Sequence, residues 1–159
     1  ASRCRRYATR TMTSIRKRAP RASSDAVRRA MQAVASEHTG PEMLLRRGLH
    51  AIGLRYRLHE RPEPDLRCEA DIVFRSKKLC VFVDGCFWHG CPEHASWPKQ
   101  NADFWRQKIE TNRARDMDTD SRLVALGWEP IRVWEHESPA SAAQKIMGLV
   151  AKAKKNRAR

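Results

Sequence analysis

Two acidic residues stand at the edges of apolar runs in a way that suits a divalent cation. Asp71 heads the apolar run of residues 72–74, and Asp84 ends the run of residues 79–83. Two neighbouring strands that bring carboxylates to one edge of a sheet can hold Mg²⁺, which prefers oxygen ligands. Bound Mg²⁺ activates water and stabilises the charge of a phosphodiester transition state. Asp71 and Asp84 are therefore candidate magnesium ligands, and solvated strand-end acids are the alternative.

His89 follows Asp84 after a glycine turn and is a candidate acid–base residue. A histidine beside a metal-bound phosphate can take or give a proton at neutral pH. A zinc ligand and an exposed loop histidine are the alternatives. We expect acid–base work, because the two candidate metal ligands lie nearby in the sequence.

Cys91 and His94 have the short loop spacing of a zinc-ligand pair, and such a pair needs two further ligands from elsewhere. Asp116 and His136 are candidates for them, although spacing along the chain does not fix the choice. Two other acids remain as substitutes: Glu93 and Glu137. The sequence therefore predicts a second, structural metal site.

The five cysteines form no paired framework, which favours a reducing, cytoplasmic setting over disulfides. Cys80 and Cys86 lie in or beside apolar sequence, where a free cysteine behaves as a small hydrophobe. We therefore expect both of them to pack in the core.

Phe87 and Trp88 are adjacent aromatics in a polar, glycine-rich loop. An ordinary pair of this kind would cap the core. In a DNA-binding protein, such a pair can instead insert between base pairs and unstack a step. Mismatched steps cost less to open, so insertion would also discriminate between duplexes.

A long helix is expected over residues 103–126, with Asp103 as its cap and Gly127 as its stop signal. Its periodicity places Trp105, Asn112 and Asp116 on one face. Polar residues on an inward face need partners, which a metal or a catalytic site would provide. The opposite side, which includes Asp120, is interpreted as a solvated face.

The remaining elements must position these residues. A helix over residues 40–52 is expected first, with Glu42 near its start, where an acid interacts favourably with the helix dipole. Strands are expected at residues 54–59, 70–75, 79–84 and 130–135, and a last helix at 140–152. A turn at residues 76–78 makes the second and third strands a hairpin. This order predicts a mixed α/β sandwich on one sheet.

The chain of 159 residues has a formal charge of +14, which favours a polyanionic partner. Residues 1–24 hold eight Lys and Arg and residues 152–159 hold five, with no acid in either segment. We interpret residues 1–23 as a basic, disordered DNA-binding arm, residues 24–151 as the domain and residues 152–159 as a basic tail. A solubilising terminus and a transit peptide are the alternatives for the arm. No segment reaches the roughly 20 apolar residues that a membrane span needs.

The motifs together resemble those of the very-short-patch-repair mismatch endonucleases, a family with the restriction-endonuclease-like fold. The resemblance runs from about residue 24 to residue 137 and is most specific at residues 83–89, Val-Asp-Gly-Cys-Phe-Trp-His. Other matching motifs are Pro41-Glu42, Ala70-Asp71-Ile72-Val73, Phe104-Trp105, Lys108-Ile109, Asn112, Arg115-Asp116, Gly127-Trp128 and Val133-Trp134-Glu135.

The resemblance implies an αβββαβ core, with a mixed central sheet flanked by helices and a structural zinc site. It implies a magnesium-dependent nick on the 5′ side of the thymine in a T:G mismatch, the product of 5-methylcytosine deamination. The substrate would be double-stranded DNA with a T:G mismatch. We expect the protein to be a monomer, and DNA repair proteins are candidate partners.

The resemblance also assigns roles to individual residues. Asp71 would be the central Mg²⁺ ligand with the Val83 carbonyl, and Glu42 and His89 would complete the catalytic set. Phe87, Trp88, Trp105 and Met31 would intercalate into DNA. Zn²⁺ would be held by Cys91, His94, Asp116 and His136.

One departure concerns the strand end, where the best-known family pattern has threonine-histidine and this chain has Val83-Asp84. Asp84 is therefore a further candidate metal ligand that the family pattern does not predict. Two other hypotheses stay open: a zinc-stabilised DNA-binding module that does not cut, and a nuclease of the same fold with a different target.

Overall fold

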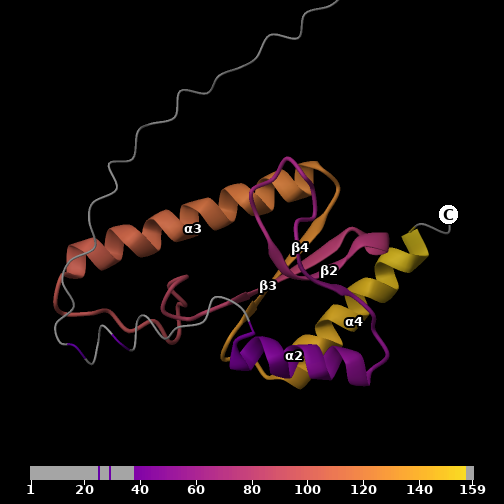
Figure 1. The fold of residues 1–159 in the computed structure, drawn as a ribbon, viewed down its shortest axis with the longest axis horizontal. Helices are drawn as coiled ribbons and strands as arrows, with labels where there is room; N and C mark the ends of the chain where they lie inside the picture. Colours follow the sequence, from indigo (N-terminus) through magenta and orange to yellow (C-terminus); the bar gives the residue numbers. More distant parts are fainter. Residues whose placement is uncertain (1–24, 26–28, 30–37, 157–159) are drawn as a thin grey trace, which may run out of the picture.

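The computed structural model describes Asp25, Arg29 and residues 38–156. Met31 and the basic arm of residues 1–23 lie outside the described residues. Within the described part, the helices and strands follow one another in the order that the sequence predicts, and they form a mixed α/β fold (Figure 1).

Four strands of the described residues form one mixed sheet in the order β1-β2-β3-β4. Their bounds are Arg57–Glu60, Ala70–Phe74, Leu79–Asp84 and Glu129–Trp134. The pairs β1–β2 and β2–β3 are antiparallel, and β4 is parallel to β3. The hairpin of β2 and β3 is confirmed, and its connection is the short helix η1 (Arg75–Lys77) followed by Lys78 in the left-handed region.

Three longer helices of the same residues cover the sheet: α2 (Gly40–Ala51), α3 (Ala102–Ala125) and α4 (Pro139–Asn156). Figure 1 shows α2 and α4 side by side on one face of the sheet and α3 on the other. The amino-terminal half of α3 extends beyond the sheet, toward the loop that follows β3. This three-layer arrangement places the loop of residues 85–101 at one end of the molecule.

The core is divided by the sheet into two clusters. On the side of α2 and α4, apolar side chains of the two helices pack on those of the strands, among them Leu49, Ile72, Val81 and Ile146. On the side of α3, the second cluster includes Phe82, Leu123 and Trp128. Because β3 contributes to both clusters, its sequence is apolar without alternation, as expected for a strand buried on both faces.

The predicted cap of α3 is wrong. The helix begins at Ala102 after Asn101, which takes the left-handed conformation, and Asp103 lies in the first turn. An acid in that turn still interacts favourably with the amino-terminal end of the helix dipole. The predicted stop is confirmed, since Gly127 has a positive φ of 77° directly after α3.

Among residues 38–156, no helix combines the length and the apolar character needed to cross a membrane.

Candidate active site and metal centre

A pocket of about 350 Å³ lies beside the edge of the sheet where β2 begins and β3 ends. Both candidate magnesium ligands line it, as do His89 and Asp116. Its basic lining residues are Arg67, Arg115 and Arg132. The pocket thus joins carboxylates, an imidazole and guanidinium groups, a combination suited to phosphate chemistry.

Asp71 enters this pocket from the second position of β2. The backbone N–H of Val83 donates a hydrogen bond of 2.7 Å to its Oδ2. Burial raises the pKa of Asp71 to about 6, and the nearby Glu42 and Asp84 carboxylates add to this effect against the Val83 hydrogen bond. A carboxylate whose charge is so poorly compensated favours a bound cation. The oxygen donors at this position fit Mg²⁺.

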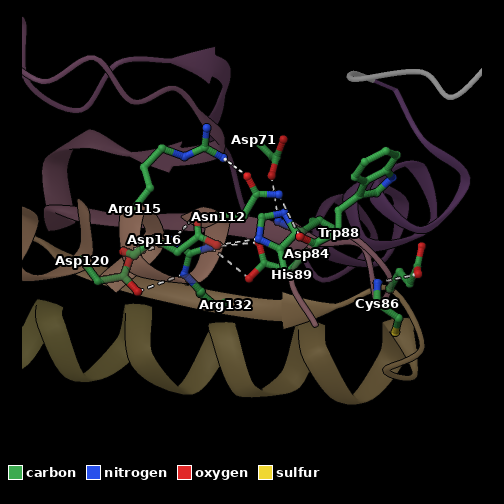
Figure 2. A network of polar contacts seen from close by, with 12 residues as sticks. Asp71, Asp84, Cys86, Trp88, His89, Asn112, Arg115, Asp116, Asp120 and Arg132 are labelled. Carbon is green, nitrogen blue, oxygen red and sulfur yellow. Dashed lines mark hydrogen bonds and ion pairs between the residues drawn. The ribbon is translucent and has the colours of Figure 1, made fainter. Parts of the chain in front are cut away.

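His89 is fixed by an acid from α3. Its Nδ1 lies 2.6 Å from Asp116 Oδ2 and 3.7 Å from Asp84 Oδ1 (Figure 2). Because a carboxylate can only accept, Nδ1 carries the proton and Nε2 is left to exchange protons with a substrate or water. The chemistry expected of His89 is therefore compatible with its geometry.

The loop that carries His89 is also tied to α3. Asn112 Nδ2 donates to the Trp88 carbonyl at 2.9 Å, and Asn112 is buried. This contact confirms that the polar residues on the inner face of α3 have partners. Asp120, interpreted from the sequence as solvated, instead accepts hydrogen bonds from Arg132 at 2.9 and 3.1 Å. Helical periodicity misses this contact because Arg132 belongs to a strand that packs beside α3.

Glu42 is far more buried than a helix-dipole role requires, with only 1% of its surface exposed. Arg46 Nη1 donates to its Oε1 at 2.9 Å, and His59 Nε2 lies 3.1 Å from the same oxygen. His38 lies close enough to form a metal-ligating group with Glu42 and His59, but Arg46 Nη1 also contacts His38 Nδ1 at 2.8 Å. The Arg46 guanidinium therefore already supplies, next to Glu42, the positive charge that a metal ion would bring to this group. Sequence reasoning misses His59, which no motif marks.

A second metal-ligating group of the described residues comprises Cys86, Cys91, His94 and His136, with ligand atoms within 4.8 Å of one another. Cys86 Sγ lies 3.1 Å from His136 Nδ1, and Cys91 Sγ lies 3.7 Å and 3.9 Å from the Nδ1 atoms of His136 and His94. In a tetrahedral zinc site, neighbouring ligand atoms lie roughly 3.3–3.8 Å apart. Two sulfurs and two imidazole nitrogens at these separations fit such an ion.

The predicted fourth ligand of this group requires correction. Asp116 contacts His89 in the pocket, and Cys86 stands in the group in its place. The physical reason is that Asp116 lies on the part of α3 facing β3 and β4, whereas residue 86 begins the loop that leads to Cys91. The signal in the sequence is the second thiol, since zinc binds cysteine and histidine in most structural sites.

The thiols of this group differ in their electrostatics. Burial raises the pKa of Cys86 to about 11, helped by the adjacent Cys91. For Cys91, burial alone would raise the pKa, but backbone N–H groups of Glu93 and His94 outweigh it and lower the pKa. Cys91 is thus the thiol more easily converted to the thiolate that a metal binds.

Four aromatic rings form a cluster beside the pocket. Phe87 lies 5.1 Å from Trp88 and 5.5 Å from Trp105, between ring centroids, and Phe104 lies 5.2 Å from Trp105. All four are half-buried. The cluster combines the loop after β3 with the first turn of α3, and its partial exposure leaves ring surface free for a ligand.

The chain is similar in sequence to known DNA endonucleases. The family described as DNA mismatch endonuclease Vsr matches residues 23–95. The type II nicking enzyme V.XorIIP of Xanthomonas oryzae pv. oryzae is 46% identical over 74% of this chain and 85% of its own length. The type II nicking enzyme V.NaeI of Lentzea aerocolonigenes is 40% identical over 75% of this chain and 73% of its own length. The DNA mismatch endonuclease Vsr of Escherichia coli K12 is 34% identical over 66% of each.

Proposed function

Because the chain belongs to the DNA mismatch endonuclease Vsr family, we propose that it nicks double-stranded DNA at T:G mismatches. The cut is on the 5′ side of the mismatched thymine, and the reaction requires Mg²⁺. The relatives' names support this assignment, since they describe nicking enzymes and a mismatch endonuclease. The product would be a nicked duplex for repair of deaminated 5-methylcytosine.

The observation that carries the proposal is the pairing of Asp71 with His89 in one pocket. Asp71 is a poorly compensated carboxylate, and His89 is held with Nε2 free. A DNA-binding module without catalysis would need neither group. We therefore place hydrolysis of the phosphodiester bond between them.

In this mechanism, the Asp71 carboxylate and the Val83 carbonyl would hold Mg²⁺, and the bound ion would supply an activated water and charge stabilisation at the phosphate. His89 exchanges a proton through Nε2, and Asp116 keeps its ring in the required tautomer. Glu42, held by Arg46 and His59, adds negative charge on the α2 side of Asp71. Arg67 and Arg115 line the same pocket and would contact DNA phosphates.

Selection of mismatched DNA is assigned to the aromatic cluster. Phe87, Trp88 and Trp105 would insert between base pairs from one groove, with Met31 from the other. Unstacking costs a few kcal/mol per step and less at a mismatch, so the same rings both bend the duplex and select the lesion.

The second metal group is assigned to structural Zn²⁺ held by Cys86, Cys91, His94 and His136. A closed set of four protein ligands leaves no open position for substrate, which is typical of a structural site. The ion would fasten the loop of residues 85–101 to the end of β4. It would thereby hold the aromatic cluster next to the pocket.

The test is nicking of labelled duplexes that are identical except for one T:G or T:A pair, with Mg²⁺ or with EDTA. We expect one cut, 5′ of the mismatched thymine, in the T:G duplex with Mg²⁺ only. Equal cutting of both duplexes would remove mismatch specificity and favour a nuclease of the same fold with another target. Mismatch binding without any cutting would favour the non-catalytic module.

A further inference from the structure

Arg132 on β4 joins three acids around the pocket (Figure 2). Its Nη1 donates to both oxygens of Asp84, at 2.9 and 3.0 Å. Its Nε and Nη2 donate to the two oxygens of Asp120, and Nη2 lies 3.6 Å from Asp116 Oδ1. The guanidinium also lies 4.9 Å from the centre of the Phe82 ring. One side chain therefore connects β3, β4 and α3 at the site.

Asp84 depends on this contact. Its side chain is only 5% exposed, and burial raises its pKa although His89 and Arg132 favour the charged form. A buried carboxylate is costly unless it is paired and hydrogen-bonded. Arg132 is half-buried, and although burial lowers its pKa, the Asp120 and Asp84 carboxylates outweigh this effect and raise it. The guanidinium is hydrogen-bonded to both oxygens of Asp84 and supplies the positive charge that a metal ion would otherwise bring to this carboxylate.

We propose that Arg132 is a positioning residue for the His89–Asp116 pair and that Asp84 is its counter-charge, not a magnesium ligand. This inference rests on the proposed nicking function. Because Arg132 holds Asp84, His89 Nδ1 pairs with Asp116 Oδ2 at 2.6 Å, whereas Asp84 Oδ1 lies 3.7 Å from the same nitrogen. Arg132 Nη2 also approaches the Asp116 carbonyl at 3.4 Å, which fixes the helix position of that acid.

Asp84, which departs from the best-known family pattern, is thus paired with Arg132. The acid at the end of β3 lies opposite Trp134 in the parallel register, and Arg132 is two residues earlier on the neighbouring strand. Residue 132 therefore reaches the same face at the same edge. An acid at position 84 without this cation would leave an unpaired buried charge beside Asp71 and Asp116.

The test compares Arg132→Met, Arg132→Lys, Asp84→Asn and the double variant Asp84→Asn/Arg132→Met. Three quantities are measured: the single-turnover nicking rate on the T:G duplex, the DNA Kd, and the Mg²⁺ concentration at half-maximal rate. Arg122→Met is the matched control, since Arg122 forms an exposed pair with Asp118 at 3.0 Å. Thermal melting verifies that each variant is folded.

We expect Arg132→Met to lower the single-turnover rate by about 10- to 100-fold, as loss of an orienting contact usually does. DNA Kd and the Mg²⁺ requirement should stay within about threefold of wild type. Arg132→Lys should recover part of the rate, because lysine keeps the charge without the two-sided geometry. The double variant should be no slower than Arg132→Met, because a neutral asparagine at position 84 needs no buried counter-charge. Arg122→Met should change nothing.

A readout independent of nicking completes the test. The imidazole nitrogen resonances of His89 should report a protonated, hydrogen-bonded Nδ1 in wild type and in Arg122→Met, and its loss in Arg132→Met. If Arg132→Met does not fold, the double variant is used for this measurement and should show the hydrogen bond weakened. Failure of the proposed function would appear as wild-type protein that does not nick, with this signal intact.

Two results would overturn the inference. A more than tenfold rise in the Mg²⁺ requirement of Asp84→Asn would make Asp84 a metal ligand. Wild-type nicking by Arg132→Met, or an unchanged His89 signal in that variant, would remove the positioning role.

Discussion

Asp71 carries a negative charge that the protein stabilises poorly without a cation. The hydrogen bond from Val83 N–H lowers its pKa, but burial and the Glu42 carboxylate raise it further, to about 6. Such a group reduces folding stability in return for binding a substrate or a metal. The fold therefore holds the Asp71 carboxylate in a position where no protein cation fully compensates its negative charge.

This imbalance predicts that Asp71→Asn stabilises the metal-free protein. The ordinary pKa of an aspartate is 3.8, whereas that of Asp71 in the folded protein is about 6. As pH rises, the unfolded chain therefore loses this proton at a lower pH than the folded protein does. Stability contributed by the neutral form is therefore lost as pH rises from about 4 to 6. The variant should gain about 1–3 kcal/mol at pH 7.5 and roughly half of that at pH 5.

Denaturant unfolding at the two pH values, with and without Mg²⁺, measures this effect. Mg²⁺ should stabilise wild type and leave Asp71→Asn unchanged. A variant less stable than wild type at pH 7.5 without metal would contradict the interpretation of Asp71.

The two metal sites predict opposite effects for Cys86 and Asp116. Cys86→Ala should reduce zinc from about one equivalent per chain to a small fraction, because three ligands hold the ion weakly. Asp116→Asn should retain zinc and slow nicking, because its contact is with His89. Elemental analysis of the purified variants measures the first outcome and single-turnover nicking the second. Zinc loss in Asp116→Asn with retention in Cys86→Ala would reverse the assignment.

The comparison of these two residues shows what a sequence can and cannot reveal about a site. Residue type and strand ends identify Asp71, Asp84 and His89, and the pocket brings them together. The same reasoning treats Cys86 as a hydrophobe and assigns Asp116 to zinc, because spacing along the chain does not say which side chains meet. It misses Arg132, Asp120 and His59, since their partners lie on other elements.

At the scale of elements, the loop after β3 depends on one glycine. Gly90 has a φ of 62°, and a Cβ at this position would lie 2.7 Å from Ile109 Cγ2. The residue lies between His89 and Cys91, so it allows the loop to approach α3 closely while serving both sites. Strain at this position would be transmitted to the imidazole and to the thiol.

Gly90→Ala is therefore expected to destabilise the protein by about 2–4 kcal/mol, through the left-handed conformation and the clash. Nicking and zinc content should fall together. Gly148→Ala in α4 is the control, because a Cβ at this position would meet no heavy atom within 4 Å, and it should be neutral or slightly stabilising. Thermal melting compares the two, and equal stability of both variants would contradict the role of Gly90.

The elements themselves are largely predictable. The apolar run of residues 79–83 predicts a strand buried on both faces, and the structure places it between the two core clusters. The start of α3 is not predictable in this way, because Asn101 enters the helix from a left-handed conformation that no side-chain pattern indicates. Local periodicity determines the helix face, whereas its boundary depends on how the preceding loop arrives.

At the scale of the whole molecule, most of the net positive charge of +14 comes from the two terminal segments. Eight Lys and Arg lie in residues 1–23 without any acid. If these residues contact DNA phosphates, they contribute affinity that weakens with salt and is independent of sequence. The aromatic cluster would then provide selection, and the basic segments would provide attraction.

Replacing these eight residues by glutamine should make DNA binding less dependent on salt. The slope of log affinity against log salt concentration should fall by up to about 7, because each phosphate contact contributes roughly 0.9. The ratio of affinities for T:G and T:A duplexes should be unchanged. Fluorescence anisotropy at several salt concentrations measures both, and an unchanged slope would remove the arm from the DNA interface.

In the proposed function, the Asp71 pocket hydrolyses the phosphodiester bond. Its most direct test is the single-turnover nicking rate of wild type and Asp71→Asn on the T:G duplex in Mg²⁺, with binding measured on the same preparations. We predict that Asp71→Asn loses at least about 10³-fold in rate, equivalent to roughly 4 kcal/mol of barrier, and binds the duplex within threefold of wild type. Nicking by Asp71→Asn at the wild-type rate would contradict this role of the pocket.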